Sequence, residues 1–440
     1  MLSFPKLPNE LIFIINTLEE NKFEAFIVGG CVRDCLLNIT PKDWDICTNA
    51  KPLEIKKIFS NFNLNTTGIK YGTVIVNINN LNFEITTYRK ELKYQNNRKP
   101  QKIVFLNKLN DDLYRRDFTI NAMAYNPSTG IIDPFNGKND LKFQVISFVG
   151  NPFDKAKEDS LRILRGIRFQ STYGFNVEEN TKKAIFQNSN LLRLLSSERI
   201  CSEFLKILNG KYAKKSLNSF KLLFFQIIPE LTYLNFSMKK NEQSQTLWNL
   251  ALNSISNCEP LINLRLALLF RHIGIYKNYN KLGILNNYEN ESIQIFNKIS
   301  SNLKIPKKHI KQTTEIIKYQ NINLPSNIIE TCHILNKINI QTYSLILKLK
   351  KAHLKAIGAP HTEITTAEHL LDKIIKNNIC YSHKKMKING NDLIKLGYTK
   401  GPNIGKALDT ILNKIINEDL QNNRLDLIEF AKQIKPTDSQ

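Results

Sequence analysis

The segment that most constrains the fold of this chain is residues 26–47, which read FIVGGCVRDCLLNITPKDWDIC. A buried strand that runs into paired glycines and then into a helix makes a turn whose backbone N–H groups can face a phosphate. If Trp44 lies in a strand, Asp43 and Asp45 project from the same face. Two carboxylates on one rigid face are suited to Mg²⁺ ions that handle a triphosphate. The segment alone would serve any nucleotidyl or phosphoryl transferase.

Further strands and helices around this segment indicate an α+β head that ends near Gly150. Apolar runs predict strands at 24–29, 42–47, 72–78, 82–87, 102–106 and 131–133, with helices at 7–20, 31–38 and 52–60. Residues 88–100, YRKELKYQNNRKP, are polar and charged and end in proline. The sequence therefore predicts a mobile loop there.

Helical periodicity dominates from Pro152 to the end of the chain, and strand signals nearly vanish. Breaks in this pattern divide the chain into a head at 1–150, a helical neck at 151–212, a helical body at 213–330 and a helical tail at 331–440. The predicted fold class is α+β, with a mixed-sheet head followed by an all-α remainder.

Charge and cysteine usage restrict the partners and the compartment. The formal net charge is +23 over 440 residues, and although Lys-rich coding in an AT-rich genome explains part of it, such a field attracts polyanions such as nucleic acid. No apolar run is long enough to predict a membrane span, and no protein partner is indicated. The seven cysteines are scattered without CxxC spacing, which predicts free thiols in the cytoplasm.

The first half of the chain contains no histidine, because the first one is His272. Chemistry there must rely on carboxylates, metal ions and arginines. The reaction that suits this set is nucleotidyl transfer, with Arg33 as a phosphate clamp. Glu84, in the predicted strand at 82–87, could supply a third carboxylate, and a solvated strand residue is an equally good interpretation.

A second motif is YRRDFTINAMAY, residues 114–125. Its charged residues are predicted at the start of an apolar-periodic helix, where Arg116 could bind a phosphate and Asp117 a ribose hydroxyl. The alternative is that Asp117 caps the helix and the arginines are solvated.

A third motif is KEDSLRILRGIRF, residues 157–169. On one helix Asp159 and Arg162 would share a face, and an arginine beside an aspartate is a donor–acceptor template for a base edge. Cytosine and adenine match that template, whereas uracil and guanine present the reverse pattern. Arg165 and Arg168 would extend toward phosphates or primer. The alternative is a set of ion pairs along the helix.

Together with DPFNGKNDL (133–141) and SSERICSEFLKIL (196–208), these motifs resemble, in order and spacing, the class II tRNA nucleotidyltransferase/poly(A) polymerase family over about the first 210 residues. Residues 387–411 resemble the C-terminal segment of bacterial CCA-adding enzymes. The resemblance implies a catalytic head, a neck that reads the incoming nucleotide, and a body and tail that hold the acceptor and T arms of tRNA.

The resemblance also implies roles for individual residues. Asp43 and Asp45 match Mg²⁺ ligands, and Glu198 with Arg199 match structural support for the neck. The nucleotide-binding positions that it implies, including the base-reading pair Asp159 and Arg162, are Gly30, Arg33, Arg116, Asp159, Arg162, Arg165 and Arg168.

Two segments indicate which kind of family member this is. GIKYGTVIV (68–76) resembles the CCA-adding type, and residues 88–100 have the length of the flexible loop of full CCA-adding enzymes. The implied activity is template-independent addition of CCA to the 3′ end of tRNA from CTP and ATP. An A-adding specialist, a poly(A) polymerase and a non-catalytic tRNA-binding protein are the alternatives.

The body contains NLRLALLFRHIGI (263–275), which resembles an HD-type phosphohydrolase helix. The His-Asp pair of such a helix is replaced here by Arg271 and His272. Gln245, Tyr288 and Gln320 stand at the other matched positions, and none of them is an imidazole or a carboxylate. The sequence therefore predicts a scaffold or an RNA surface without a metal site.

Overall fold

A computed structural model describes residues 6–95, 99–240, 243–282 and 287–435 of the chain. The contacts within it separate two units, residues 1–229 with 301–304 and residues 230–300 with 305–440. The predicted boundaries at 150, 212 and 330 are finer than this division and stay predictions. None of the described helices has the length and apolar character needed to cross a membrane.

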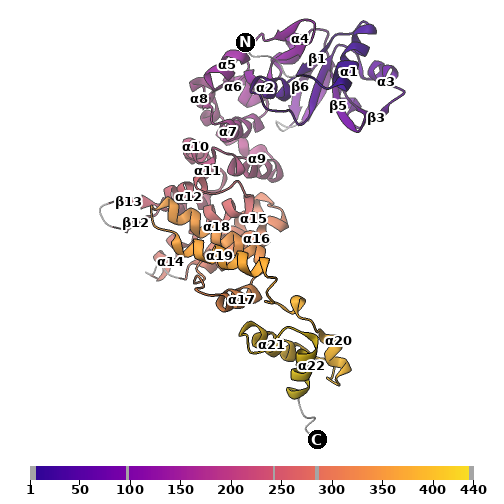
Figure 1. The fold of residues 1–440 in the computed structure, drawn as a ribbon. Coiled ribbons are helices and arrows are strands. Elements are labelled where there is room, and N and C mark those ends of the chain that lie inside the picture. The colour runs from indigo at the N-terminus through magenta and orange to yellow at the C-terminus, as the bar shows by residue number, and fades with distance from the viewer. Residues whose placement is uncertain (1–5, 96–98, 241–242, 283–286, 436–440) are drawn as a thin grey trace. The chain divides into compact units, whose positions relative to one another are not determined.

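The head is built on a mixed seven-stranded sheet, as the sequence predicts (Figure 1). The strand order is β3-β4-β5-β2-β1-β8-β9, and the only parallel neighbours in it are β2 and β5. The bounds are β1 Ala25–Val28, β2 Trp44–Thr48, β3 Asn63–Asn65, β4 Thr73–Ile78, β5 Leu81–Thr87, β8 Ala124–Asn126 and β9 Gly130–Ile132.

Apolar alternation explains why the central strands form. In β4, TVIVNI, every second side chain is buried, as a strand with one face on the core requires. Buried side chains from β1, β2, β8 and α4 (Leu109–Tyr114), together with that of the residue after β5, pack in one cluster: Val28, Cys47, Tyr88, Leu109, Leu113 and Ala124. This packing fixes the ends of β1 and β2, where the paired glycines and the two aspartates lie. The helices of the head are α1 Asn9–Glu20, α2 Gly30–Leu36, α3 Pro52–Ile58, η1 Ile69–Tyr71 and α4 Leu109–Tyr114.

The prediction of a loop at 88–100 is wrong. Residues Arg89–Gln95 form β6 and Lys99–Phe105 form β7, and the two strands pair as an antiparallel hairpin outside the main sheet. A two-stranded ribbon of this kind is held mainly by backbone hydrogen bonds. Its charged composition therefore does not show the apolar alternation on which strand prediction relies.

The helix predicted after Asp117 is also wrong. A single 3₁₀ turn, η2 Thr119–Asn121, is followed by β8, whose Ala124 pairs with Val28 of β1. Pairing with the sheet prevails over the helical spacing of the apolar residues, because a contact with a neighbouring strand can override a local preference.

Residues 157–169 are likewise not one helix. Helix α6 (Pro152–Glu158) ends before Asp159, whose backbone is extended at φ −142° and ψ 103°, and α7 (Leu161–Tyr173) begins after it. The Asp159 carboxylate accepts the Leu161 N–H at 3.0 Å, so an aspartate that could cap a new helix start breaks the predicted helix in two.

The rest of the first unit is helical apart from one short parallel pair of strands. It comprises α5 Gly137–Phe143, β10 Val145–Ile146, β11 Asn176–Val177, α8 Glu179–Gln187, η3 Ser189–Leu194, α9 Ser197–Asn209, α10 Ala213–Ser219 and α11 Lys221–Ile227. The 3₁₀ helix η4 Pro229–Asn235 begins at residue 229 and continues into the second unit.

In its described residues, the second unit is helical except for one β-ribbon that the sequence did not predict. It comprises β12 Ser237–Lys240, β13 Gln243–Thr246, α12 Leu247–Ser256, α13 Ile262–Phe270, α14 Gly274–Leu282, α15 Glu289–Leu303, α16 Lys307–Lys318, α17 Ile328–Lys337, α18 Ile340–Ala356, α19 Thr362–Lys376, η5 His383–Lys385, α20 Gly390–Lys395, α21 Pro402–Ile416 and α22 Arg424–Gln433.

Candidate active site

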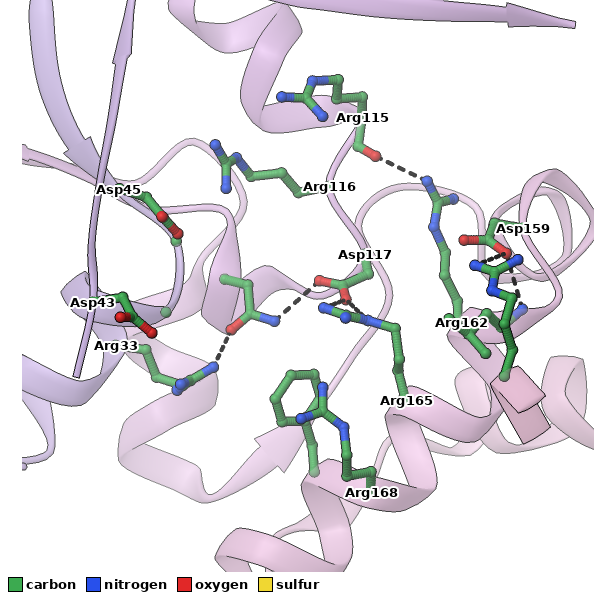
Figure 2. A pocket seen from close by; sticks show the side chains of 16 residues that line it. Arg33, Asp43, Asp45, Arg115, Arg116, Asp117, Asp159, Arg162, Arg165 and Arg168 are labelled. Atoms are coloured by element: carbon green, nitrogen blue, oxygen red, sulfur yellow. Dashed lines mark hydrogen bonds and ion pairs between the residues drawn. The ribbon is translucent and has the colours of Figure 1, made fainter. Parts of the chain in front are cut away.

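A pocket of about 710 Å³ lies in the first unit, where the turn after β1, strand β2, segment 115–121 and helix α7 meet (Figure 2). Apart from Glu84, every site residue predicted above is among those that line it. The lining residues are Gly29, Gly30, Arg33, Asp43, Asp45, Arg115, Arg116, Asp117, Asn121, Asp159, Leu161, Arg162, Arg165, Arg168, Phe169 and Arg199. The pocket therefore gathers three motifs that are spread over more than a hundred residues of the chain.

The two aspartates lie on the same side of the pocket (Figure 2). Asp43 is exposed just before β2, whereas Asp45 lies within the strand and is half-buried. Burial raises the pKa of Asp45 to about 6; the Glu84 and Asp43 carboxylates add to the shift, and the Arg116 guanidinium opposes it. Crowded oxygen ligands whose charges repel each other fit a hard divalent cation such as Mg²⁺.

Glu84 is the direct neighbour of Asp45 on the parallel strand β5. Its side chain is exposed and is outside the set that lines the pocket. Across the described ranges, no group of three or more His, Cys, Asp or Glu residues is arranged to hold a metal ion. A role for Glu84 as a third metal ligand stays a prediction.

The turn between β1 and α2 depends on Gly29. Its φ of +86° is rarely adopted by residues with a side chain, and a Cβ there would lie 2.9 Å from Nη1 of Arg116 and 3.9 Å from Oδ2 of Asp45. The Gly29 N–H donates to the Met123 carbonyl at 3.3 Å. This glycine thus makes room for an arginine beside the carboxylates, and its N–H is already used within the head.

Arg33 on α2 is 7% exposed and is held from several sides. Nη1 donates to Oδ1 of Asn121 at 2.5 Å, and Nε and Nη2 donate to Oδ1 of Asp34 at 2.9 and 2.7 Å. The guanidinium carbon also lies 5.0 Å from the centre of the Tyr173 ring and 5.4 Å from that of Phe169. Arg33 is therefore a positive charge of fixed position in the pocket wall.

Asp112, a residue that the sequence analysis did not single out, positions the arginines of the second motif. It is fully buried, and its two carboxylate oxygens accept from Nε of Arg115 at 2.8 Å and from Nη2 of Arg116 at 3.2 Å. Arg116 is thereby directed toward Asp45 (Figure 2). An aspartate three and four residues before two arginines is the signal that would have indicated this support.

Asp117 is buried and strongly paired. Burial raises its pKa, but the Arg165 guanidinium and hydrogen bonds from Asn121 and the Phe118 N–H lower it further, so the resulting pKa is about 2. Oδ2 lies 2.6 Å from Nη2 of Arg165, and Oδ1 accepts from Asn121 at 3.0 Å. These partners already occupy both oxygens, so contact with a ribose would compete with them.

Arg162 and Asp159 both line the pocket but are held by different partners. Arg162 donates to Oε2 of Glu158 at 2.6 Å and to the Arg115 carbonyl at 2.9 Å. Asp159 lies 3.8 Å from Nη2 of Arg199. Burial raises the pKa of Asp159, and the charges of Arg199, Arg162 and Arg165 oppose that shift. The two residues expected to read the base therefore line the same pocket, Asp159 just before the start of α7 and Arg162 just after it.

Arg165 and Arg168 both project from α7 toward the centre of the pocket (Figure 2). Arg165 pairs with Asp117, and Nε of Arg168 lies 2.7 Å from Oε2 of Glu203 on α9. Both guanidinium groups lie near the Phe169 ring, at 5.7 and 4.6 Å from its centre. The pairing leaves these arginines charged and oriented toward the pocket.

Two pocket residues were missed or placed in another role by the sequence analysis. Arg199 was predicted to support the neck, yet it lines the pocket beside Asp159, and its buried Nη1 lacks a hydrogen-bond partner within the described residues. Asn121 bridges Arg33 and Asp117. An amide four residues after Asp117 was the available signal for Asn121; no local signal indicates that Arg199 reaches the pocket.

Comparison with known proteins agrees with this arrangement. Residues 25–147 match the poly A polymerase head domain, residues 174–234 the RNA- and SrmB-binding site of polymerase A, and residues 282–431 tRNA nucleotidyltransferase domain 2. A CCA-adding enzyme of Ligilactobacillus salivarius is 34% identical over 96% of this chain and 95% of its own length. One of Lacticaseibacillus paracasei is 31% identical over 96% and 95%.

Solved structures give the same result. The crystal structure of Bacillus stearothermophilus CCA-adding enzyme in complex with CTP has a TM-score of 0.73 at 26% identity, and the match covers 98% of both chains. The Thermotoga maritima CCA-adding enzyme complexed with tRNA has a TM-score of 0.57 at 22% identity, with 96% and 94% of the chains covered, and it supports the fold alone.

Proposed function

The chain belongs to the CCA-adding enzymes, a family of tRNA nucleotidyltransferases, and we propose that the pocket in its first unit carries the transfer reaction. The enzyme adds CCA to the 3′ end of tRNA from CTP and ATP without a nucleic-acid template. The observation that carries this conclusion is the relationship to a CCA-adding enzyme along 96% of the chain.

In each step the 3′-hydroxyl oxygen of the RNA attacks the α-phosphorus of the nucleotide. A phosphodiester bond forms, and the bond between the α-phosphorus and the oxygen that bridges to the β-phosphate breaks. Pyrophosphate leaves with that oxygen, and the hydroxyl proton is released. We propose that Asp43 and Asp45 hold Mg²⁺, since their oxygen-only donor set fits that ion. When bound there, the ion would assist deprotonation of the hydroxyl and neutralise the triphosphate.

We propose that Arg33 and Arg116 bind the triphosphate, with Gly30 in the same turn. This assignment is supported by their fixed positions near the carboxylates, because preorganised cations stabilise developing charge without reorganising. Asp117 would contact the ribose only when Arg165 exchanges partners, so its first role is to orient Arg165 and Asn121.

We propose that Asp159 and Arg162 read the base edge, with Arg165 and Arg168 extending the site. Replacing both Asp159 and Arg162 by alanine should reduce discrimination against UTP and GTP more than it weakens triphosphate binding. Competition assays with all four nucleotides measure this directly. Equal losses for all four nucleotides would contradict the assignment.

The body and tail at 213–440 are proposed to hold the acceptor and T arms of tRNA, supported by the net charge of +23 on the whole chain, which attracts a polyanion. A cytoplasmic location is also proposed. It is supported by the seven cysteines, all within the described residues and all free thiols.

The decisive experiment is sequencing of products made from tRNA that ends before CCA, with CTP, ATP and Mg²⁺ present together. Addition of two C residues and one A is expected. Addition of A alone would indicate an A-adding specialist, and long A runs a poly(A) polymerase. Absence of any product from a protein that still binds tRNA would indicate a non-catalytic binder.

A further inference from the structure

The body contains a second cluster of cationic and imidazole side chains, between helices α13 and α18. Arg271 follows the last residue of α13 and His272 comes next; they are only 6% and 7% exposed. The His272 ring centre lies 5.9 Å from that of His353 on α18 and 5.7 Å from that of Tyr288. Because α13 and α18 contact each other, side chains about eighty residues apart converge here.

The cluster concentrates positive charge. Burial lowers the pKa of the Arg271 guanidinium to about 10, with only the Tyr288 phenol opposing the shift. Burial is the main reason why the pKa values of His272, His353 and Lys350 are lowered, and the positive charge of Arg271 is the second reason. The geometry brings the same groups together: Lys350 and His353 are three residues apart on one face of α18, and the His353 ring contacts that of His272, the residue next to Arg271.

Within the described residues, Arg271 has no carboxylate partner. Two carboxylates act on the edge of the cluster, that of the exposed Glu363 on Lys350 and that of Glu289 on Tyr288, and neither is among the groups that shift the pKa of Arg271. Residues 281–286, which precede Tyr288, contain neither Asp nor Glu in their sequence. Nδ1 of His353 is buried without a hydrogen-bond partner in the same described part. A buried cation without a counter-ion is unfavourable, so this cluster is suited to an anionic ligand.

We propose that Arg271, Lys350 and His353 bind a phosphate-type oxyanion in the body. A guanidinium offers a planar pair of donors, an ammonium offers a point charge, and a neutral imidazole can carry its N–H on Nδ1. Such a set of donors from two helices matches the several acceptor oxygens of a phosphate. In the sequence, Arg271 and His272 stand where an HD-type helix would carry metal ligands. With these residues the same position is suited to an anion and no longer to a metal cation.

The oxyanion could be a free ion, such as inorganic phosphate or pyrophosphate, or a phosphodiester of RNA. The 6% exposure of Arg271 favours the small free ion, because an RNA backbone needs an accessible surface. The proposal does not depend on nucleotidyl transfer, since all of its residues lie in the second unit.

Histidine NMR separates this site from the arginine-rich pocket. All seven histidines of the chain lie at or after residue 272, so none is in the first unit. The full-length protein with isotope-labelled histidines is titrated with inorganic phosphate, and chloride keeps the ionic strength constant. Saturable shifts of the His272 and His353 signals are expected. The signals of His333 and His369 are internal controls and should not shift.

Arg271→Met removes the charge and retains an apolar side chain, and it should abolish these shifts. Lys350→Met should weaken them and provides a second test if the first variant does not fold. The matched control is Lys348→Met, on the same helix, because Lys348 is paired with Glu259 at 2.9 Å and should leave the titration unchanged.

Shifts that persist in folded Arg271→Met, or equal shifts of all histidines, would overturn the proposal. A parallel titration with tRNA identifies the source of the oxyanion. A response of His272 and His353 to tRNA but not to phosphate would assign the site to the RNA backbone, and a response to neither would refute it.

Discussion

Asp43 is the residue that best separates the chemistry from the fold, because it is exposed and lies just before β2. Asp43→Ala should abolish nucleotide incorporation while the melting temperature stays close to that of the wild type, since exposed substitutions usually change stability by no more than about 0.5 kcal/mol. Asp111→Ala, an exposed aspartate of α4 outside the pocket, is the matched control. Substantial incorporation by Asp43→Ala would exclude it as a metal ligand.

Asp117 should make the first unit sensitive to acid. Its pKa of about 2 in the folded protein lies below its ordinary value of 3.8, so the ionised form is favoured by folding. The stabilisation is therefore fully present above pH 3.8 and is lost as the pH falls toward 2. It amounts to about 2 kcal/mol by linkage.

Asp117→Asn should lower the melting temperature at neutral pH, and the difference from the wild type should narrow as the pH falls from 4 toward 2. Thermal melts across that range measure the effect. A constant difference at every pH would mean that packing of the side chain, and not its charge, provides the stabilisation.

At the level of single residues, sequence reasoning found the groups with a chemical signature and missed those that support them. Spacing and charge mark Asp43, Asp45 and the arginines of the three motifs, whereas nothing local marks Arg199 as a pocket residue. Asp112 and Asn121 act through hydrogen bonds to arginines whose direction depends on the fold. A local pattern carries no such information.

At the level of elements, the central strands and first helices were predictable because burial imposes a period of two or about 3.6 residues. The hairpin β6–β7, the turn η2 and the break at Asp159 were not predictable from such periods. Each depends on a contact with another part of the chain or on a local hydrogen bond, such as that from the Leu161 N–H to Asp159. Helical spacing in the sequence cannot reveal that a side chain interrupts the helix.

Helix α7 contacts Arg33, the proposed phosphate clamp, through Tyr173. The Tyr173 hydroxyl donates to Oδ1 of Asp34 at 3.2 Å, and its ring lies 5.0 Å from the Arg33 guanidinium carbon. Tyr173→Phe should lose only the hydrogen bond. Tyr173→Ala should also lose the cation–π contact, which is worth about 0.5–2 kcal/mol. We expect kcat/KM to fall more for alanine than for phenylalanine.

Because Arg33 is proposed to contact phosphates and not bases, the fall for Tyr173→Ala should be similar with CTP and ATP. Steady-state kinetics with each nucleotide test this. A loss confined to one nucleotide would instead assign Tyr173 to base recognition.

At the scale of the whole chain, the sequence separates the proposed reaction site from the part proposed to bind RNA more clearly than secondary structure does. The first 210 residues carry every motif with a chemical signature, whereas the second unit is recognised mainly by helical periodicity and charge. A net charge of +23 is a property that no single motif expresses, and it bears on polyanion binding more than on fold.

This charge predicts different salt dependences for the two substrates. Counter-ions released from the RNA backbone make tRNA affinity fall steeply with salt, with a slope of about −0.7 to −0.9 in logarithmic units for each phosphate contacted. CTP meets a pocket in which arginines are already paired with carboxylates such as Asp117 and Glu203, and it has only three phosphates. Raising the salt concentration should therefore increase KM for tRNA by a much larger factor than KM for CTP, as measured at constant Mg²⁺. If KM for tRNA and KM for CTP increased by the same factor, most of the positive charge would not contact RNA. The body and tail would then hold tRNA mainly through uncharged surfaces.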